Sequence, residues 1–391
     1  MTRALDGQPV NSLSVYIHIP FCVSKCRYCT FNSYAGLGHL YEAYVEALQK
    51  EIVLFGESEE AWQAETIYLG GGTPTVLRVD LLNQILQSCR ERFILAEDIE
   101  ISIEANPRSV EPGYLRALRD LGVNRLSLGI QSFSNEMLAL LGRVHTVTDA
   151  IEAYHAAREA GFENVNLDLI YALPSQTLEQ WRTDLAEATA LGPEHLSLYC
   201  LSVEEGTPLG DIVAAGSLPS PDADVAAEMY TWAEECLQNA EYQHYEISNW
   251  ARTGYQCRHN ITYWRNRPYL GFGAGAHSFR GKRRYYNVAD PAEYIRLVLA
   301  GGDTRSGSEM IDEALEMSET MIMGLRLNEG VSFEQFEERF RLPLAVVYDE
   351  QIGILVGQGL VHVNGSGLRL TTRGRLLGNE VFERFLPSSS G

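Results

Sequence analysis

Three cysteines near the start of the chain, Cys22, Cys26 and Cys29, are separated by three and then two residues. Thiolates at this spacing can hold one side of a [4Fe–4S] cluster, and because such a cluster normally takes four cysteines, one iron would remain open to an outside ligand. A tetrahedral zinc site would need a fourth Cys or His at similar spacing, and the next histidine, His39, follows a glycine-containing loop. The spacing alone leaves cluster, zinc and redox sites open. Tyr28, just before the third cysteine, and the strand-like run before the first favour the cluster.

The segments around the cysteines alternate between strand-like and helical patterns. Strand candidates lie at 15–19, 66–69, 99–104, 125–130, 165–170 and 196–201, and helical candidates near 40–55, 80–92, 113–121, 147–160 and 178–190. This alternation indicates a parallel sheet with right-handed crossovers. Six units are fewer than the eight that close a TIM barrel. We therefore predict an α/β fold with a partial, three-quarter barrel of six β/α units.

Polar residues follow the predicted strands, at the end where barrels of this kind carry their chemistry. The second strand ends in the glycine–threonine turn 70–75, the third in Glu104 and the fourth in Gln131, with Arg143 soon after. The fifth carries Asp168. Singly, the glycines could form only a turn, the carboxylates could be solvated or salt-bridged, and Gln131 could cap a helix. Together with the cysteines they indicate one shared ligand.

These motifs resemble the HemN/HemW branch of the radical S-adenosylmethionine (SAM) superfamily over nearly the whole chain. The matching stretches are 16–22, the glycine–threonine turn, 104–107, 129–133, 141–143 and 166–169. The resemblance implies the partial barrel and a [4Fe–4S] cluster held by the three cysteines, with its open iron chelated by the amine and carboxylate of SAM. It also implies one-electron reduction of the sulfonium, which releases methionine and a deoxyadenosyl radical.

The same resemblance implies a role for individual residues in holding SAM. Gly71, Gly72 and Thr73 would line the methionyl end, and Arg143 would pair with the carboxylate, a bidentate task that suits a guanidinium. The remaining roles are Glu104 at the methionine or ribose end, Gln131 and Asp168 at the ribose, Tyr28 beside the adenine and Tyr16 near the sulfonium.

One position separates the groups within this branch. The residue two after the third cysteine is Phe31, where the anaerobic coproporphyrinogen oxidases have a fourth cysteine. Those oxidases also carry a longer extension before the first strand. Both departures favour the heme-chaperone group. The alternative is an oxygen-independent coproporphyrinogen III oxidase or another radical SAM enzyme that modifies tetrapyrroles.

A segment at 252–284 carries eight arginines or lysines and no Asp or Glu. Such a cationic stretch in an acidic protein suggests a local anionic ligand or membrane headgroups. The alternative is a set of surface arginines paired with carboxylates elsewhere in the chain.

Within this segment, residues 257–264 match the HNxxYW pattern of the heme-chaperone group. His259 offers an imidazole for heme iron, while Tyr263 and Trp264 offer flat apolar faces for a porphyrin, and nearby arginines suit its propionates. His277, in a glycine-rich loop, is a second candidate ligand. Alternatively, His259 caps a turn and Trp264 belongs to the core.

Composition narrows the class of protein. The net charge of −21 disfavours general nucleic-acid binding, because polyanions are held by cationic patches. The sequence has no run of about 18 apolar residues that would span a membrane, and its first eleven residues lack the apolar core of a secretory signal. Seven cysteines, three of them clustered, argue against a disulfide framework. We expect a cytoplasmic protein.

The pattern changes near residue 303, so we predict a first domain over 1–302, including the heme-binding segment 252–284, and a second over 303–391. Helical patterns at 311–327, 333–340 and 346–358 precede a hairpin at 360–370. This order indicates a winged-helix-like domain. Because a DNA reader should be basic and this stretch is acid-rich, we expect a cover over the barrel mouth or a docking surface.

Taken together, the residues and the resemblance predict a heme-binding and heme-delivering protein on a radical SAM scaffold. Its expected cofactors are the [4Fe–4S] cluster, SAM and heme. Its expected partners are heme-accepting apo-proteins, with membrane-bound respiratory enzymes as the leading class. A peripheral membrane contact and a homodimer are compatible with this interpretation.

Overall fold

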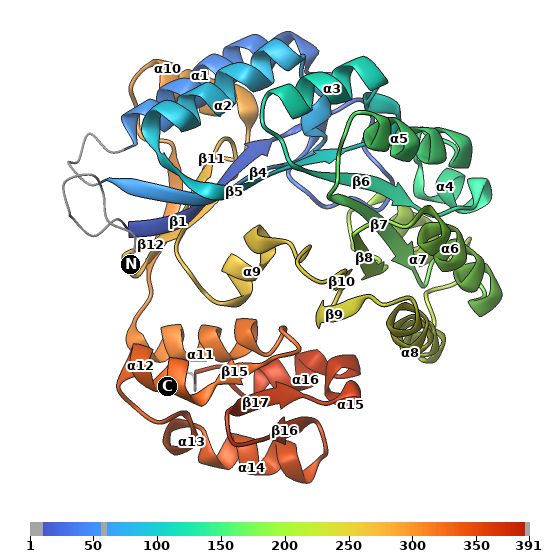
Figure 1. The fold of residues 1–391 in the computed structure, drawn as a ribbon, viewed down its shortest axis with the longest axis vertical. Helices are drawn as coiled ribbons and strands as arrows, with labels where there is room; N and C mark the ends of the chain where they lie inside the picture. Colours follow the sequence, from blue (N-terminus) through green and yellow to red (C-terminus); the bar gives the residue numbers. More distant parts are fainter. Residues whose placement is uncertain (1–10, 56–60, 388–391) are drawn as a thin grey trace.

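The computed structural model describes residues 11–55 and 61–387. A curved sheet with helices on its convex side forms the larger part of the molecule, and a smaller unit of helices and short strands lies on the concave side (Figure 1). Among the described residues, none of the helices combines the length and apolarity needed to cross a bilayer. The stretch before Asn11, in which we expect no secretory signal, lies outside the described residues.

Six neighbouring parallel strands form the wall of the partial barrel, as predicted. They are β1 (Asn11–Ile19), β4 (Trp62–Gly71), β5 (Ile94–Ala105), β6 (Arg125–Gln131), β7 (Val165–Tyr171) and β8 (His195–Cys200). The helices between them are α1 (Tyr41–Leu54), α2 (Val79–Arg92), α3 (Pro112–Asp120), α4 (Asn135–Leu141), α5 (Val147–Glu159) and α6 (Leu178–Leu191). The α/β fold with an open barrel of six units is therefore confirmed.

The sheet extends beyond the predicted strands at both edges, to twelve strands in the described residues. Next to β1 lie β11 (Tyr269–Phe272), which is parallel to it, and then the antiparallel strands β12 (His277–Arg280), β13 (Arg283–Asn287) and β14 (Arg305–Met310). Next to β8 lie β10 (Asn249–Ala251) and β9 (Gln243–Glu246), both antiparallel. Because β14 pairs with β13, the large sheet continues past residue 303, where we place the domain boundary. That boundary stays a prediction.

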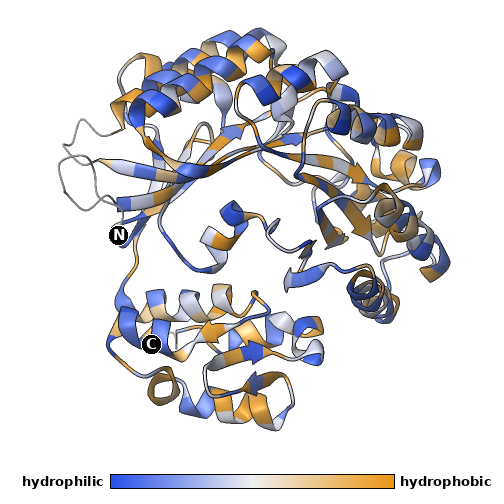
Figure 2. Ribbon diagram, in the orientation of Figure 1, coloured by the Kyte–Doolittle hydropathy of each residue, from blue (hydrophilic) through white to orange (hydrophobic). Residues whose placement is uncertain are grey.

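The burial pattern of the wall explains why these segments form strands and helices. On β1, Val15, Ile17 and Ile19 are fully buried, and residues two apart on a strand share one face. In the ribbon coloured by hydropathy, hydrophobic and hydrophilic residues alternate along the strands of the wall and along the outer helices (Figure 2). Helix α6 begins at a capping box formed by Thr177 and ends at Gly192 in the left-handed conformation, which are strong local start and stop signals.

Shorter elements complete the first part of the chain. They are β2 (Phe21–Cys22), β3 (Tyr34–Ala35), α7 (Pro208–Ala214), α8 (Ala223–Asn239), α9 (Arg258–Trp264), α10 (Pro291–Leu299) and the 3₁₀ turns Gly38–Leu40, Pro74–Val76 and Pro107–Ser109. Helix α9 lies on the concave side of the wall, between the strands and the smaller unit (Figure 1).

The smaller unit contains α11 (Glu313–Gly324), α12 (Phe333–Phe340), α13 (Leu344–Val347), α14 (Asp349–Gly357), α15 (Thr372–Leu376), α16 (Gly378–Glu383) and the strands β15 (Val331–Ser332), β16 (Val361–Val363) and β17 (Gly367–Leu370). The hairpin predicted at 360–370 corresponds to β16 and β17, which pair antiparallel. The single helix expected at 346–358 is two helices, because Tyr348 leaves the helical region with φ −123°.

The smaller unit packs on α9 and on the β9–β10 edge. The guanidinium of Arg326 lies 4.5 Å from the ring centroid of Trp264, and the N–H of Asn328 donates to the carbonyl of Tyr245 at 3.0 Å. Arg375 forms an ion pair with Glu234 on α8 at 2.5 Å. These contacts hold the unit against the concave side of the wall.

Candidate functional site

A cavity of about 430 Å³ lies at the carboxyl ends of the parallel strands. All three cysteines line it, together with every residue expected to bind SAM except Tyr16: Cys22, Cys26, Cys29, Tyr28, Gly71, Gly72, Thr73, Glu104, Gln131, Arg143 and Asp168. Segments more than 140 residues apart along the sequence therefore meet at one place, at the strand ends where the chemistry was expected.

The three thiols are half-buried and each has a polar neighbour at the rim of this cavity. Thr73 Oγ1 lies 3.7 Å from Cys22 Sγ, Arg143 Nη1 lies 3.3 Å from Cys26 Sγ, and Ser33 Oγ lies 4.0 Å from Cys29 Sγ. Burial raises the pKa of the Cys22 thiol. The three cysteines thus supply three sulfur donors, and among the described residues no acidic side chain is hydrogen-bonded to any of them.

The arrangement of donors distinguishes a cluster from a single metal ion. Among the described residues, no three His, Cys, Asp or Glu side chains converge closely enough to hold one ion. In a tetrahedral zinc site all donors must meet at one atom, whereas cluster thiolates bond to different irons. His39, considered as a fourth zinc ligand, is exposed and does not line this cavity. The donor set fits a cluster better than zinc.

Arg143 reaches the cavity from the turn after α4. Its Nη2 donates to the carbonyl of Gly129 at 2.7 Å, and its buried Nε has no hydrogen-bond partner among the described residues. Burial lowers the pKa of this group, but Tyr28 and Cys26 outweigh that effect and raise it overall. A buried guanidinium with an unused N–H is suited to an anionic ligand such as a carboxylate.

Glu104 lies between the glycine turn and the neighbouring strand. Its Oε1 accepts a hydrogen bond from the Tyr68 hydroxyl at 2.8 Å, and its Oε2 accepts one from the N–H of Gly71 at 3.1 Å. Burial raises the pKa of Glu104 to about 7, with a further contribution from the charge of Asp168. The carboxyl therefore changes its charge near neutral pH.

Asp168 and Gln131 also line the cavity. Asp168 accepts hydrogen bonds from Ser127 Oγ at 3.0 Å and from Asn166 Nδ2 at 2.8 Å. Burial raises its pKa. Gln131 has φ +71°, a conformation that is costly for a residue with a side chain and is retained mainly where the surroundings require it.

The glycine turn lies directly against the backbone that carries the cysteines. The N–H of Gly72 donates to the carbonyl of Ile19 at 2.9 Å, and that of Thr73 to the carbonyl of Phe21 at 2.8 Å. A Cβ at Gly72 would lie 2.5 Å from the Phe21 carbonyl oxygen, closer than atoms can approach. Position 72 therefore requires glycine.

The two tyrosines expected at the SAM site lie in different places. Tyr28 lines the cavity beside the thiols. Tyr16 instead lines an adjoining cavity of about 400 Å³ together with Glu104 and Gly71, and its hydroxyl bonds with Nδ1 of His18 at 2.9 Å. Tyr16 is thus close to the predicted site without lining its main cavity.

The HNxxYW motif forms α9, with His259 only 1% exposed. Nδ1 of His259 bonds with Thr66 Oγ1 at 2.7 Å, and Nε2 bonds with the Tyr263 hydroxyl at 2.8 Å. Burial lowers the pKa of His259 to about 3. In this structure the ring has no free nitrogen to offer an iron. The N–H groups of Arg258 and His259 both donate to the carboxylate of Glu100, which anchors the start of α9 to β5.

The other three heme candidates also differ in environment. Trp264 lies under Arg326 at the junction with the smaller unit, away from the cavities described above. Tyr263 lines the 400 Å³ cavity, as does His277. His277 is exposed and stacks on Tyr286, with ring centroids 5.0 Å apart.

Several residues of the basic segment are paired with carboxylates, which was the alternative to an anionic ligand. Arg258 pairs with Glu65 and Asp98, Arg265 with Glu329, Lys282 with Glu316 and Arg284 with Glu319. These pairs join the segment to β4, β5 and the smaller unit. Much of the positive charge of the basic segment is therefore paired with carboxylates of the same protein.

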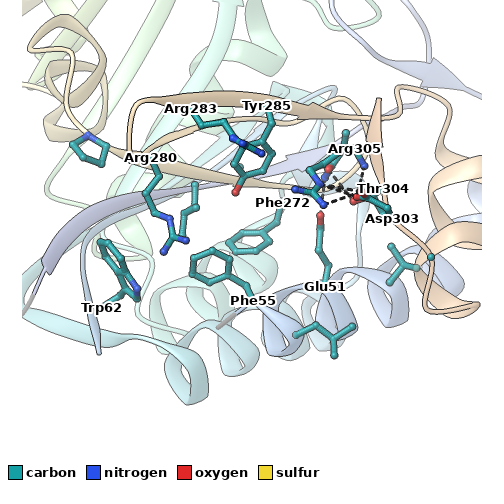
Figure 3. Close-up of a pocket in the computed structure, with 18 of the residues that line it drawn as sticks. Glu51, Phe55, Trp62, Phe272, Arg280, Arg283, Tyr285, Asp303, Thr304 and Arg305 are labelled. Carbon is teal, nitrogen blue, oxygen red and sulfur yellow. Dashed lines mark hydrogen bonds and ion pairs between the residues drawn. The ribbon is translucent and has the colours of Figure 1, made fainter. Parts of the chain in front are cut away.

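A larger cavity of about 1020 Å³ lies elsewhere, between α1 and strands β11–β13 (Figure 3). Arg280 lies over the rings of Phe55 and Trp62, and Arg305 pairs with Asp303 at 2.8 Å. Glu51 at its inner end accepts hydrogen bonds from Gly273, Asn287 and Tyr294. None of the three cysteines lines this cavity.

Sequence reasoning missed the residues that support the cavity from within the strands. Tyr68 holds Glu104, while Ser127 and Asn166 hold Asp168. The sequence contains part of the information needed to find them. Tyr68 precedes Gly70 by two positions and Asn166 precedes Asp168 by two, and residues two apart on a strand lie on the same face.

The comparisons with known proteins agree with this geometry. The Radical SAM superfamily model matches residues 16–188 and the HemN C-terminal domain model matches 311–377. A relative in Lactococcus lactis named heme chaperone HemW is 38% identical, over 95% of this chain and 97% of its own length. One of the same name in Bacillus subtilis is 37% identical, over 95% and 99%.

A solved structure of coproporphyrinogen III oxidase (HemN) from Escherichia coli, described as a radical SAM enzyme, superimposes with a TM-score of 0.85 at 28% identity. The superposition covers 97% of this chain and 91% of that one. With relatives above 30% identity along almost their full length, this chain belongs to the HemW family of the radical SAM superfamily.

Proposed function

We propose that this protein binds heme and delivers it to heme-requiring apo-proteins, on a scaffold that carries a [4Fe–4S] cluster and SAM. The observation that carries the proposal is the near-full-length similarity to two relatives named heme chaperone HemW. The exposed Phe31, which lines the cysteine cavity, supports it, because the resemblance places a fourth cysteine at this position in the oxidases.

In this proposal Cys22, Cys26 and Cys29 hold the cluster, which supplies an electron to the SAM sulfonium when both are bound. The three thiols and the unused N–H of Arg143 in one cavity support this assignment. Arg143 would bind the SAM carboxylate, and the backbone of the turn at Gly71–Thr73 would line its methionyl end.

The remaining assignments concern the orientation of the nucleoside. Asp168, already fixed by Ser127 and Asn166, would accept hydrogen bonds from ribose hydroxyls together with Gln131. Tyr28 would contact the adenine. Glu104 would hold the methionine or ribose end as a carboxylate, which ties SAM binding to its charge near neutral pH.

Loss of the cluster ligands tests the metal assignment. After anaerobic reconstitution, Cys22→Ala, Cys26→Ala and Cys29→Ala should each lose most of the iron and the absorbance near roughly 400 nm that is typical of such clusters. Cys236→Ala, on α8 and outside the cavity, should retain both. Full iron content in all three variants would contradict the assignment.

The alternative function is oxygen-independent coproporphyrinogen III oxidation, favoured by the superposition on HemN. Two assays on the same reconstituted protein separate the functions. A heme chaperone should give a Soret change on titration with hemin and no decarboxylated product with coproporphyrinogen III, SAM and reductant. Turnover of coproporphyrinogen without heme binding would replace the proposal by the oxidase.

The finer parts of the proposal concern location and partners. We infer a cytoplasmic protein that meets membrane-bound respiratory enzymes as recipients, with peripheral membrane contact and a homodimer as further features. Transfer of heme to a respiratory apo-protein in proteoliposomes, flotation with liposomes and light scattering test these three features separately. Failure of transfer to every apo-protein tested, with heme binding intact, would contradict the delivery step.

A further inference from the structure

We infer that α9, the helix of the HNxxYW motif, is a positioning element of the SAM site. Two links made of side chains inside the barrel join the start of α9 to Glu104 and Asp168, the two carboxylates assigned to SAM. The inference rests on the proposed function, because it concerns the site to which SAM is assigned there. It gives the motif a task that is independent of heme.

The first link, called the Tyr68 link, connects His259 to Glu104. The ring of His259 stacks on that of Tyr68, with centroids 5.0 Å apart and planes inclined by 27°. The hydroxyl of Tyr68 donates to Oε1 of Glu104 at 2.8 Å, and Oε2 of the same carboxyl accepts the N–H of Gly71. Because the His259 ring limits the rotation of the Tyr68 ring, it keeps the Tyr68 hydroxyl directed at Glu104.

The ring of His259 is itself fixed in the barrel. Its Nδ1 bonds with Thr66 Oγ1 on β4, and its Nε2 bonds with the hydroxyl of Tyr263 on α9. The backbone N–H of His259 donates to the carboxylate of Glu100 on β5. A buried ring that is hydrogen-bonded at both nitrogens is held in one orientation. His259 therefore presents a rigid surface to Tyr68.

The second link, called the Tyr245 link, runs from Cys257, the residue that caps the start of α9, to Asp168. The backbone N–H of Cys257 donates to the hydroxyl oxygen of Tyr245 at 3.3 Å, and this hydroxyl bonds with Nε2 of His195 at 2.8 Å. Nδ1 of His195 bonds with Oδ1 of Asn166 at 2.6 Å, and Nδ2 of Asn166 donates to Asp168 at 2.8 Å. Successive hydrogen bonds therefore join the backbone of α9 to a carboxylate of the SAM site.

The hydrogen bonds of the Tyr245 link all donate toward Asp168. A backbone N–H can only donate, so the Tyr245 hydroxyl accepts from Cys257 and directs its own proton to Nε2 of His195. Oδ1 of Asn166 can only accept, so Nδ1 of His195 carries the ring proton. Burial lowers the pKa of His195 well below its ordinary value, which agrees with a neutral ring. Hydrogen bonds aligned in this way strengthen one another, and the last of them opposes the effect of burial on the pKa of Asp168.

The residues inside the barrel are of the kind that such links require. Thr66, Asn166 and His195 are at most 1% exposed, and each precedes by two positions a hydroxyl or carboxyl residue on the same face of its strand. TIM barrels normally fill their interior with branched apolar residues, and buried polar groups are costly unless they are hydrogen-bonded. Packing alone therefore does not account for these residues, whereas the orientation of two carboxylates does.

The test of the Tyr245 link measures SAM affinity by anaerobic calorimetry on the reconstituted, heme-free, full-length protein. Tyr245→Phe breaks the link at one hydroxyl, and we expect SAM affinity to fall about three- to fivefold, the size expected for the loss of one hydrogen bond. Tyr242→Phe is the matched control, because it removes a buried hydroxyl that donates to the carbonyl of Pro193 and does not line the cavity. It should bind SAM as the wild type does.

A double-mutant cycle tests the Tyr68 link. His259→Gln should weaken SAM binding about fivefold in the wild-type background but less than about twofold in the Tyr68→Phe background, because the two residues act through one interaction. A merely structural effect of His259→Gln would be equally large in both backgrounds. Tyr263→Phe, which removes only the bond at Nε2 of His259, takes its place in the cycle if His259→Gln does not fold.

Tyr245→Phe and Tyr68→Phe act in different links, so their losses of SAM affinity should multiply. Iron content and circular dichroism of each variant should match those of the wild type. Wild-type SAM affinity in Tyr245→Phe, or an equal effect of His259→Gln in both backgrounds, would overturn the inference and leave the proposed function intact. Failure of the wild type itself to bind SAM would overturn the SAM assignment of the proposed function.

Discussion

The hydroxyl of Tyr68 donates a 2.8 Å hydrogen bond to the carboxyl of Glu104 on the neighbouring strand. The same carboxyl accepts the N–H of Gly71, so one side chain joins β4, β5 and the glycine turn of the candidate SAM site. Tyr68 also stacks on His259, with ring centroids 5.0 Å apart. Tyr68 therefore connects helix α9 to the cavity above it.

Tyr68→Phe removes this donor, and we expect SAM affinity to fall about five- to tenfold at pH 7, which corresponds to roughly 1 to 1.4 kcal/mol, within the range of an ordinary hydrogen bond. Because the bond stabilises the carboxylate, its loss raises the pKa of Glu104 above about 7. SAM binding, measured by anaerobic calorimetry, should then require a higher pH than in the wild type. Tyr114→Phe, which loses a bond to the carbonyl of Leu77 and does not line the cavity, is the control, and equal affinities in both variants would contradict the role of Tyr68.

Gly72→Ala places a methyl group 2.5 Å from the carbonyl oxygen of Phe21, so the backbone before Cys22 must move. We expect reduced iron incorporation and weaker SAM binding, with the secondary structure unchanged by circular dichroism. Gly113→Ala, in α3, has no neighbouring atom within 4 Å of the added Cβ and should behave as the wild type. A fully loaded cluster in Gly72→Ala would show that the cysteine loop tolerates the displacement.

Glu51 predicts a pH dependence of stability that does not involve the cofactors. Burial raises its pKa from 4.5 to about 7 in the folded protein, although three hydrogen bonds oppose the shift. The stability that this group contributes is therefore fully present below its unfolded pKa and is lost as the pH rises through about 7. In Glu51→Gln, the melting temperature should therefore fall less than in the wild type as the pH rises from 4.5 to about 7.

Glu46→Gln, on the exposed side of the same helix, should leave that pH profile unchanged. Glu104 and Asp184, whose pKa values are raised to about 7 and about 6, contribute a fall of the same sign in both variants. An identical profile in Glu51→Gln and the wild type would show that Glu51 does not retain its proton in the folded state.

Glu100→Ala tests how α9 is held inside the barrel. The carboxylate accepts the N–H groups of Arg258 and His259 at 2.9 and 3.2 Å, and leaving buried donors unpaired costs about 1 to 3 kcal/mol. We expect a loss of this size in the free energy of urea unfolding. Glu97→Ala, an exposed position on the same strand, should change stability by no more than about 0.5 kcal/mol, and equal effects of the two variants would contradict the anchoring role of Glu100.

The order of strands and helices followed from the sequence because each depends on a short-range pattern. Alternating buried residues such as Val15, Ile17 and Ile19 specify a strand, and local signals such as the Thr177 cap and Gly192 specify where a helix begins and ends. The strands at the sheet edges, including β12 and β14, were not predicted. Strand β14 is mostly exposed, and the four-residue β12 has only Ser278 and Phe279 buried side by side in sequence, so neither shows the alternating hydrophobic pattern that marks a wall strand.

The candidate cluster and SAM residues also followed from the sequence, since their motifs stand at the ends of successive parallel strands, which meet at one edge of a sheet. Only the tertiary structure decided which histidine is accessible. Thr66 and His259 are 193 positions apart and share a hydrogen bond, and no short-range pattern encodes such a contact. Both ring nitrogens of His259 are buried and hydrogen-bonded to distant residues. His277, on the hairpin of β12 and β13, is exposed. The difference depends on how distant segments pack, which a short-range pattern does not encode.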